Sequence, residues 1–280
     1  MSDVAATRVA EALRDARARG LDRLDAQLLL AHVLARPRAW LLAHDDASLD
    51  DSQHGAWQSL LRRRLSGEPL AYLVGAKEFH GLALRVDANV LVPRPETELL
   101  VDWAIERLAA MPERAARIVD LGTGSGAIAL AVKHAVPSAQ VLATDIDPGA
   151  LQVAQTNASR LGLDIRWHLG SWWSGLAGER FGLILGNPPY IAGGDPHLAA
   201  LRHEPALALT PGGDGLDALR AIVAGAPDHL DAGGWLLLEH GHDQAAAVRA
   251  LLSQAGFGAV QSRRDLAGIE RCSGGQTPRG

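Results

Sequence analysis

The sequence predicts an α/β protein in which a mostly parallel, Rossmann-like sheet follows a small helical bundle. After Pro93, short apolar segments alternate with amphipathic helices, which is the order that builds a parallel sheet covered on both faces. Up to residue 75, apolar residues instead recur at helical spacing. The chain of 280 residues, 48% hydrophobic and 21% charged, is long enough for one large domain or two smaller ones.

The helical bundle is expected over residues 1–75. The segment Leu21–Asp25 leads into a run of four leucines and one valine that ends at Leu34, and Pro37 stops this helix or starts the next one. A further helix is expected from about Asp50 to Gly67, because Trp57, Leu60, Leu61 and Leu65 would share one of its faces.

A hairpin over residues 76–93 is expected to link the bundle to the second domain, residues 94–280. In it, the alternating segment 79–86 would turn at residues 87–89 into a return strand at 90–92. The parallel strands of the second domain are expected at residues 118–121, 141–145, 181–185 and 235–239. Its helices are expected at about residues 96–110, 126–135, 148–161, 214–230 and 243–255. Residues 257–263 and 268–272 predict a terminal antiparallel hairpin.

Composition excludes several classes of protein. No apolar run approaches the roughly 18 residues of a membrane span, and the N-terminus lacks the pattern of a secretory signal. The single cysteine, Cys272, can neither form an internal disulfide nor hold zinc alone, so we expect a cytoplasmic protein without a metal site. A net charge of −5 argues against a protein that grips long nucleic acids through their phosphates.

A glycine-rich loop follows the first predicted strand of the second domain. Glycines at 122, 124 and 126 let the backbone turn tightly and let a ligand approach the start of the next helix. Asp145, at the end of the following strand, is placed where a carboxylate can accept the hydroxyls of a ribose. The loop predicts a nucleotide-like ligand but does not separate a nicotinamide enzyme from a methyltransferase.

A second unusual segment, Asn187-Pro188-Pro189-Tyr190, follows the strand at 181–185. The two prolines fix the backbone and remove two donors, so the segment is rigid and cannot continue the sheet. The side-chain oxygen of Asn187 and the carbonyl of Pro188 could then accept from one planar NH2 group, with the Tyr190 ring against its face. This arrangement favours an amide or an exocyclic amine as the substrate. The alternative is a plain turn at the end of a strand.

Six segments occur in an order that is typical of one family. They are Gly67–Tyr72, Glu78–Gly81, Val92–Glu98, Asp120–Gly126, Asn187–Ile191 and Glu239–Gly241. From about residue 20 to its end, the chain resembles the HemK-type family of class I S-adenosylmethionine-dependent methyltransferases. The resemblance implies that the chain methylates the side-chain amide nitrogen of the glutamine in the Gly-Gly-Gln motif of peptide chain release factors, which would modulate translation termination.

The resemblance also implies the cofactor site. The loop residues Gly122, Thr123, Gly124, Ser125 and Gly126 would cradle the methionine part of the cofactor. Asp145 would hold the ribose, and Trp172 would lie beside the adenine, although its neighbour Trp173 leaves open which ring is used. Asp120 is expected to reach the ammonium group. Many relatives have Asp where this chain has Ser171, which puts a carboxylate contact to the adenine amino group in doubt.

Substrate binding and catalysis are expected to share one segment. The resemblance implies that Asn187, Pro188, Pro189 and Tyr190 grip the substrate glutamine, with Asn187 next to the cofactor as well. An amide nitrogen is a poor nucleophile because its lone pair is delocalised. Catalysis by Asn187, Pro188 and Tyr190 would therefore consist mainly of orienting that nitrogen.

Other charged residues near the expected site have two interpretations each. Glu96, Thr97 and Glu98 either complement the dipole of the helix that they open or contact the cofactor. His240 is interpreted as a hydrogen-bonded structural histidine, with a general base as the alternative. The tail tripeptide Gly274-Gly275-Gln276 copies the substrate motif, and either chance or automethylation would explain it.

The expected partner is a peptide chain release factor. The protein is expected to be a monomer that binds neither nucleic acid nor a membrane. The helical bundle is expected to recognise the partner, and the run Arg62-Arg63-Arg64 either meets an acidic surface or is simply solvated. The rival functions are a nucleic-acid adenine-amino methyltransferase and a noncatalytic nucleotide-binding module.

Overall fold

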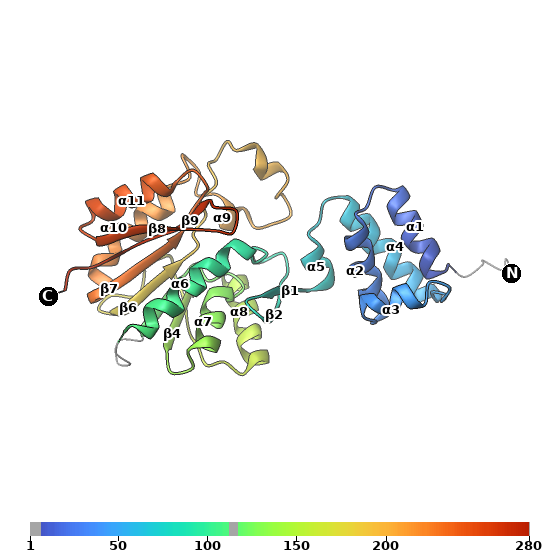
Figure 1. Ribbon diagram of the computed structural model, residues 1–280, viewed down its shortest axis with the longest axis horizontal. Helices are drawn as coiled ribbons and strands as arrows, with labels where there is room; N and C mark the ends of the chain where they lie inside the picture. The colour runs from blue at the N-terminus through green and yellow to red at the C-terminus, as the bar shows by residue number, and fades with distance from the viewer. Residues whose placement is uncertain (1–6, 112–116, 280) are drawn as a thin grey trace. The chain divides into compact units, whose positions relative to one another are not determined.

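The computed structural model describes residues 7–111 and 117–279 (Figure 1). The chain divides into two compact units, Met1–Gly75 and Ala76–Gly280. Each unit has a hydrophobic core of its own. The α/β fold class predicted from the sequence is confirmed.

The N-terminal unit is a bundle of short helices. They are α1 (Val9–Ala18), α2 (Arg23–Leu34), α3 (Arg38–Ala43), α4 (Asp51–Leu65) and α5 (Leu70–Val74). Asp22 caps α2 by accepting from the backbone N–H of Leu24 at 2.7 Å, and Asp50 forms a reciprocal capping box with Gln53 at the start of α4. Trp57 is fully buried in this core, as the helical spacing predicted.

The linking hairpin differs from its prediction. It consists of β1 (Ala76–Phe79) and β2 (Leu82–Arg85). The predicted turn at residues 87–89 is present, with the N–H of Val90 donating to the carbonyl of Asp87 at 3.2 Å, but the return strand at 90–92 is wrong. The chain turns at His80 and Gly81, which both have positive φ, 49° and 77°. A two-residue turn keeps the alternation of buried and exposed side chains in step, which is why residues 79–86 read as one strand.

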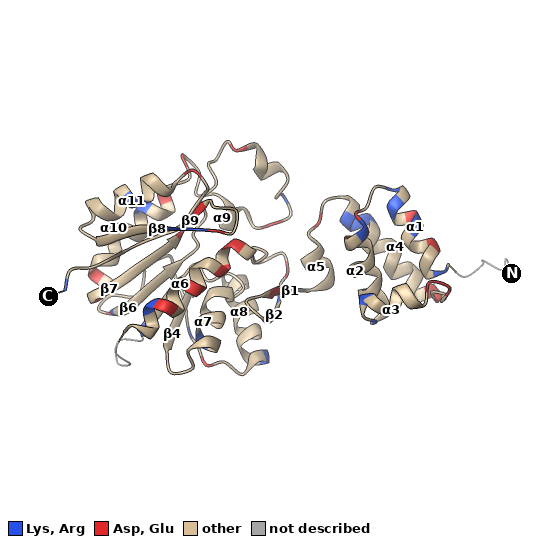
Figure 2. Cartoon of the chain, viewed as in Figure 1, with Lys and Arg blue, Asp and Glu red and all other residues tan. Residues whose placement is uncertain are grey.

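The acidic side chains of α6 (Glu98–Ala109) anchor this turn. Figure 2 shows acidic positions spaced along α6. Glu98 accepts from the backbone N–H of His80 at 2.9 Å, and Asp102 lies 2.9 Å from the ring Nε2 of the same histidine. The Glu78–Gly81 segment and the start of α6 therefore form one fastened corner.

Seven strands build the central sheet, in the order β5-β4-β3-β6-β7-β9-β8. Their bounds are Arg117–Leu121 (β3), Gln140–Asp145 (β4), Arg166–Leu169 (β5), Phe181–Gly186 (β6), Leu230–Glu239 (β7), Gly258–Arg264 (β8) and Glu270–Gln276 (β9). The first five strands in this order, from β5 at the edge to β7, are parallel. The strand β9 pairs antiparallel with both β7 and β8, as predicted. The edge strand β5, of sequence Arg-Trp-His-Leu, was not predicted.

Helices cover both faces of the sheet (Figure 1). One core packs α6, α7 (Ala127–Ala135) and α8 (Pro148–Leu161) against residues such as Ile118. The other packs α10 (Asp217–His229) and α11 (Ala245–Gln254) against residues such as Val119. Neighbouring residues of a strand thus face different cores, as period-2 alternation requires. The described part of this unit also contains the short 3₁₀ segments η1 (Pro95–Thr97) and η3 (Pro196–Ala199) and the short helix α9 (Ala206–Leu209).

The tail tripeptide is part of the sheet. Gly274 and Gly275 lie in β9 opposite Leu237 and Leu236 of β7. A Cβ atom added to Gly274 would lie 2.7 Å from the backbone carbonyl oxygen of Leu236, so the close approach of the strands requires glycine there. Gln276 donates through Nε2 to the carbonyl of Gly233 at 2.7 Å. All three residues of this tripeptide therefore take part in the pairing and packing of the sheet.

In the part of the chain that the structure describes, no helix combines the length and the apolar character needed to cross a membrane.

Candidate functional site

A cavity of about 440 Å³ opens at the carboxyl ends of β3, β4 and β6. The chain runs from β3 outward to β4 on one side and continues later with β6 on the other, which makes this edge a topological switch point. Leu121, the last residue of β3, pairs with Thr144 of β4 and with Gly186 of β6. The glycine loop, Asp145 and Asn187 therefore all begin at the same level of the sheet.

The glycine loop forms one wall of this cavity. Gly122, Gly124 and Gly126 have φ of 72°, 56° and 84°, which side chains with a Cβ rarely adopt. Gly126 precedes α7 directly, and a Cβ there would lie 2.9 Å from Leu130 Cδ1. Gly122, Thr123, Gly124 and Ser125 line the cavity, whereas Gly126 is packed behind the loop.

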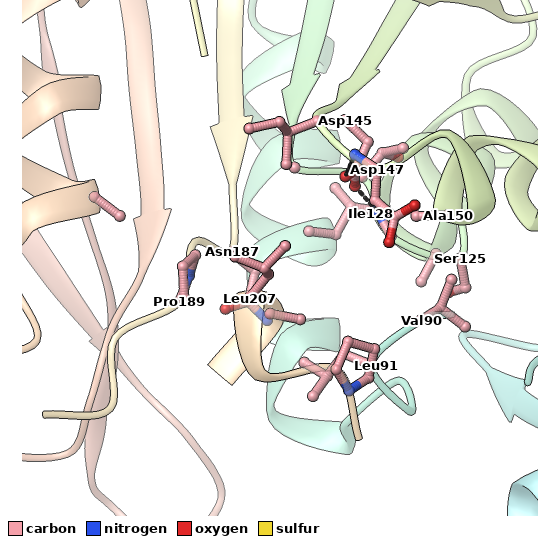
Figure 3. Close-up of a pocket in the computed structure, with 18 of the residues that line it drawn as sticks. Val90, Leu91, Ser125, Ile128, Asp145, Asp147, Ala150, Asn187, Pro189 and Leu207 are labelled. Atoms are coloured by element: carbon pink, nitrogen blue, oxygen red, sulfur yellow. Dashed lines mark hydrogen bonds between the residues drawn. The ribbon is translucent and has the colours of Figure 1, made fainter. Parts of the chain in front are cut away.

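Asp145 is tied to the same loop. Its Oδ2 accepts from the backbone N–H of Gly124 at 2.8 Å, and its Oδ1 accepts from the N–H of Asp147 at 2.9 Å. Burial raises the pKa of this carboxyl group, against the effect of these hydrogen bonds. Figure 3 shows Asp147, Ser125 and Ala150 on one side of the cavity and Asn187 with Leu207 on another.

Asp120 lies behind the glycine loop. It is fully buried, and its Oδ2 accepts from Thr123 Oγ1 at 2.6 Å and from the N–H of Ala129 at 3.3 Å. Oδ1 has no hydrogen-bond partner among the described residues. Burial raises the pKa of Asp120 to about 7. Asp120 does not line the cavity, so it would affect a bound ligand only through Thr123, which does.

The two adjacent tryptophans have different surroundings. Trp172 lines the cavity, and a Cβ on Gly122 would lie 3.3 Å from its Cζ3 atom. Its φ of 43° is unusual for a bulky residue, a strain of the kind found at functional sites. Trp173 points elsewhere, because it stacks on His229 at 4.6 Å and donates through Nε1 to the carbonyl of Ala221 at 3.2 Å.

The segment after β6 is held by partners from distant parts of the sequence. Asn187 and Pro189 line the cavity, whereas Pro188 is buried beside them. Asn187 donates through Nδ2 to Thr97 Oγ1 at 3.2 Å. The Tyr190 hydroxyl donates to Glu239 Oε1 at 3.3 Å, and Gln244 donates through Nε2 to the Tyr190 carbonyl at 2.9 Å.

Burial also shifts the ionisation of groups in this region. It raises the pKa of Glu239 to about 7 and raises the pKa of Tyr190, so the tyrosine is neutral. His240 is fully buried, and its ring nitrogens lie 2.9 Å from the Gly241 carbonyl and 2.7 Å from Ser273 Oγ. Burial lowers the pKa of His240. These contacts favour the structural interpretation of this histidine over a general base.

Several contacts that shape the site were not predicted from the sequence. Arg94 forms an ion pair with the buried Glu204, and Asn157 bridges the hairpin and the glycine loop. Leu207 of α9 lines the cavity although it is 72% exposed. Of the three residues 96–98, only Thr97 lines the cavity. The described residues include no group of three or more His, Cys, Asp or Glu placed to hold a metal ion.

Two family models match the chain. Residues 5–75 match a model described as the PrmC N-terminal domain, and residues 97–216 match one described as the methyltransferase small domain. Curated relatives named release factor glutamine methyltransferase match nearly the whole length. The one from Bordetella pertussis is 54% identical over 259 residues, which are 91% of this chain and 95% of the relative. The one from Xylella fastidiosa is 50% identical over 270 residues, 95% and 98% of the two chains.

Solved structures of methyltransferases share the fold. A methyltransferase from Pyrococcus furiosus has a TM-score of 0.54 at 18% identity and covers 79% of this chain and 99% of its own. A Thermus thermophilus 16S rRNA N2 G1207 methyltransferase in complex with AdoMet and guanosine has a TM-score of 0.54 at 22% identity, over 72% of this chain and 49% of its own. At these identities the likeness shows the fold alone.

Proposed function

This chain belongs to the release factor glutamine methyltransferase family, and from that premise we infer that it transfers a methyl group from S-adenosylmethionine to a glutamine side chain of a release factor. The observation that carries this inference is the Asn187 side chain, which lines the cavity at the same level of the sheet as the glycine loop. That placement suits the transfer of a methyl group from a bound cofactor to a planar NH2 group.

The cavity residues fit S-adenosylmethionine. The volume of about 440 Å³ lies within the usual range for small-molecule sites. The cradle at Gly122 is one that a Cβ would narrow, because the Trp172 ring lies directly over it. We propose that Gly122, Thr123, Gly124 and Ser125 hold the methionine part, with Gly126 shaping the turn. Asp145 would accept from the ribose hydroxyls, and Trp172 would lie against the adenine.

Catalysis would consist mainly of positioning the substrate amide nitrogen next to the methyl group of the cofactor. Bound S-adenosylmethionine supplies a methyl group activated by a sulfonium. Asn187 Oδ1 and the Pro188 carbonyl accept from the two N–H bonds of the substrate amide, and Pro189 and Tyr190 fix the segment that carries them. These acceptors orient the amide nitrogen and stabilise the positive charge that develops on it. The N5 nitrogen of the glutamine in a Gly-Gly-Gln motif is the target that we propose.

The helical N-terminal unit is proposed to recognise the release factor, which its match to the PrmC N-terminal domain supports. Within the arginine run, Arg63 pairs with Glu68 at 2.5 Å and Arg64 pairs with Asp25 at 2.7 Å. Arg62 is exposed and forms no ion pair among the described residues, so it is the member of the run best placed to meet an acidic partner. We further propose a cytoplasmic monomer that acts on protein and not on nucleic acid.

Methyl transfer from labelled cofactor tests this function. Purified release factor should become labelled, whereas DNA, RNA and reactions without substrate should not. A release factor in which the Gly-Gly-Gln glutamine is replaced by alanine is the matched control and should stay unlabelled. Labelling of nucleic acid alone would favour the rival adenine-amino methyltransferase, and binding of cofactor without any transfer would favour a nucleotide-binding module.

A further inference from the structure

A buried polar contact lies behind the substrate side of the cavity. Thr97 is 4% exposed and stands at the end of η1, 90 residues before Asn187 in the sequence. Its Oγ1 atom accepts from Asn187 Nδ2 at 3.2 Å. Both residues line the cavity. Thr97 is therefore part of the support of Asn187, and the site as proposed above assigns it no role.

The direction of this hydrogen bond decides what Asn187 presents to a substrate. A carboxamide carries an acceptor oxygen on one side and a donor NH2 on the other. Because Nδ2 is engaged with Thr97, Oδ1 is the atom left for the substrate. If the amide rotated by half a turn, its NH2 group would face the NH2 group of a glutamine, donor against donor.

The carboxyl group of Glu239 lies near Thr97, close enough for Thr97 to affect the pKa of that carboxyl group. This carboxyl group is 1% exposed at the end of β7, and hydrogen bonding from Thr97 and Tyr190 lowers its pKa against the effect of burial. A hydroxyl has one proton, so a Thr97 that donates to Glu239 has only lone pairs to offer Asn187. Such a donation would orient the Thr97 hydroxyl, and the hydroxyl would in turn orient the Asn187 amide.

We propose that Thr97 is a positioning residue for methyl transfer, which holds the Asn187 amide so that its oxygen faces the substrate NH2. The proposal rests on the function proposed above. It explains why the Pro-Arg-Pro-Glu-Thr-Glu segment stands beside the substrate end of the cavity, with its threonine turned inward. Thr97 acts through Asn187 and takes no part in the chemistry itself.

The test compares Thr97→Val, which keeps the shape but lacks the hydroxyl, with Thr97→Ser, which keeps the hydroxyl. We expect Thr97→Val to lower kcat by ~10-fold, less than the loss from removing a direct contact. The Kd of the cofactor, measured by calorimetry, should stay within about threefold of the wild-type value. Thr97→Ser should retain kcat within about threefold. Equal losses in both variants, or a loss of cofactor affinity that matches the loss of rate, would overturn the proposal.

A double-mutant cycle separates action through Asn187 from an independent role. In an Asn187→Ala background, Thr97→Val should change kcat by less than about threefold, because the side chain that it positions is gone. If Thr97→Val still lowered kcat by ~10-fold in that background, the proposal would be overturned.

An activity-independent measurement distinguishes failure of this proposal from failure of the proposed function. The side-chain NH2 signals of Asn187, assigned by their absence in Asn187→Asp, should be protected from exchange in the wild type and in Thr97→Ser and lose protection in Thr97→Val. If wild-type protein transfers no methyl group to the release factor, the proposed function fails while this readout still decides the role of Thr97. Unchanged protection in Thr97→Val would contradict that role.

Discussion

Arg94 and Glu204, 110 residues apart in the sequence, form an ion pair in which Arg94 Nη2 lies 2.5 Å from Glu204 Oε1. The Glu204 side chain is 3% exposed, and its second oxygen accepts from the backbone N–H of Val92 at 3.0 Å. This contact fastens the segment that opens α6 to the segment between β6 and α10. The two segments supply Arg94, Thr97 and Leu207 to the cavity, so the ion pair holds one of its walls.

Replacing Arg94 by alanine should destabilise the C-terminal unit. The change leaves a buried carboxylate without its cation, which costs roughly 3–5 kcal/mol when both partners are buried. Because Arg94 is 34% exposed, we expect ~2–3 kcal/mol. Glu204→Gln, which removes the charge and keeps an acceptor for Val92, should cost less, and the double variant should recover part of the loss. Denaturant unfolding measures all three, and an Arg94→Ala cost below about 0.5 kcal/mol would contradict this role.

Asn157 of α8 should be as important for stability as an apolar core residue. Its side chain accepts from the backbone N–H of Arg85 at 2.7 Å and donates to the carbonyls of Arg85 and Ser125, both at 2.9 Å. Asn157→Leu would leave three backbone groups without hydrogen-bond partners, at about 1–3 kcal/mol each. We therefore expect the unfolding free energy to fall by at least ~3 kcal/mol. The exposed neighbour Gln155→Ala is the control and should change the unfolding free energy by less than ~0.5 kcal/mol. Similar losses in both variants would show that the bridge to the glycine loop is unimportant.

The tandem tryptophans should separate binding from stability. Trp172→Ala removes the ring over Gly122, and we expect the Kd of S-adenosylmethionine to rise by ~10-fold, about 1.4 kcal/mol. Trp173→Ala removes the ring that stacks on His229, so it should lower the unfolding free energy and leave the Kd within about threefold. Calorimetric titration and thermal unfolding of both variants provide the comparison. A larger change in Kd for Trp173→Ala than for Trp172→Ala would reverse the assignment.

Glu239 should make stability depend on pH. Burial raises its pKa from 4.5 to about 7, hydrogen bonds from Thr97 and Tyr190 lower it, Glu96 raises it and Arg271 lowers it. Between these pH values the folded protein holds a proton that the unfolded chain has released. Raising the pH through this interval therefore destabilises the fold by at most ~1.4 kcal/mol per pH unit.

The variant Glu239→Gln isolates this effect, because the other titrating groups are common to both proteins. The unfolding free energy of Glu239→Gln relative to wild type should rise as the pH increases from about 5 to about 7, and it should level off above that range. Urea unfolding across this range gives the difference at each pH. A difference that does not vary with pH would mean that Glu239 keeps an ordinary pKa in the folded protein.

The positions of the two main loops of this site could be predicted from the sequence, because each loop directly follows an apolar strand. Gly122 follows β3, Asn187 follows β6, and parallel strands bring their carboxyl ends to one edge of the sheet. The strand β5 escaped prediction because an edge strand can be polar on both faces, and the hairpin turn was misplaced because a two-residue turn preserves alternation. Glu204 and Asn157 carry no local pattern, since their contacts join residues 110 and 72 positions apart.

The most direct test of the account is the rate of methyl transfer to the release factor glutamine by Asn187→Ala, measured together with the affinity of the variant for S-adenosylmethionine. Removing one preorganised contact to the reacting group typically costs roughly 100-fold in kcat, and we predict a loss of that size, with the cofactor Kd within about threefold of wild type. A variant whose kcat stays within about threefold of the wild-type value would contradict catalysis by positioning at Asn187.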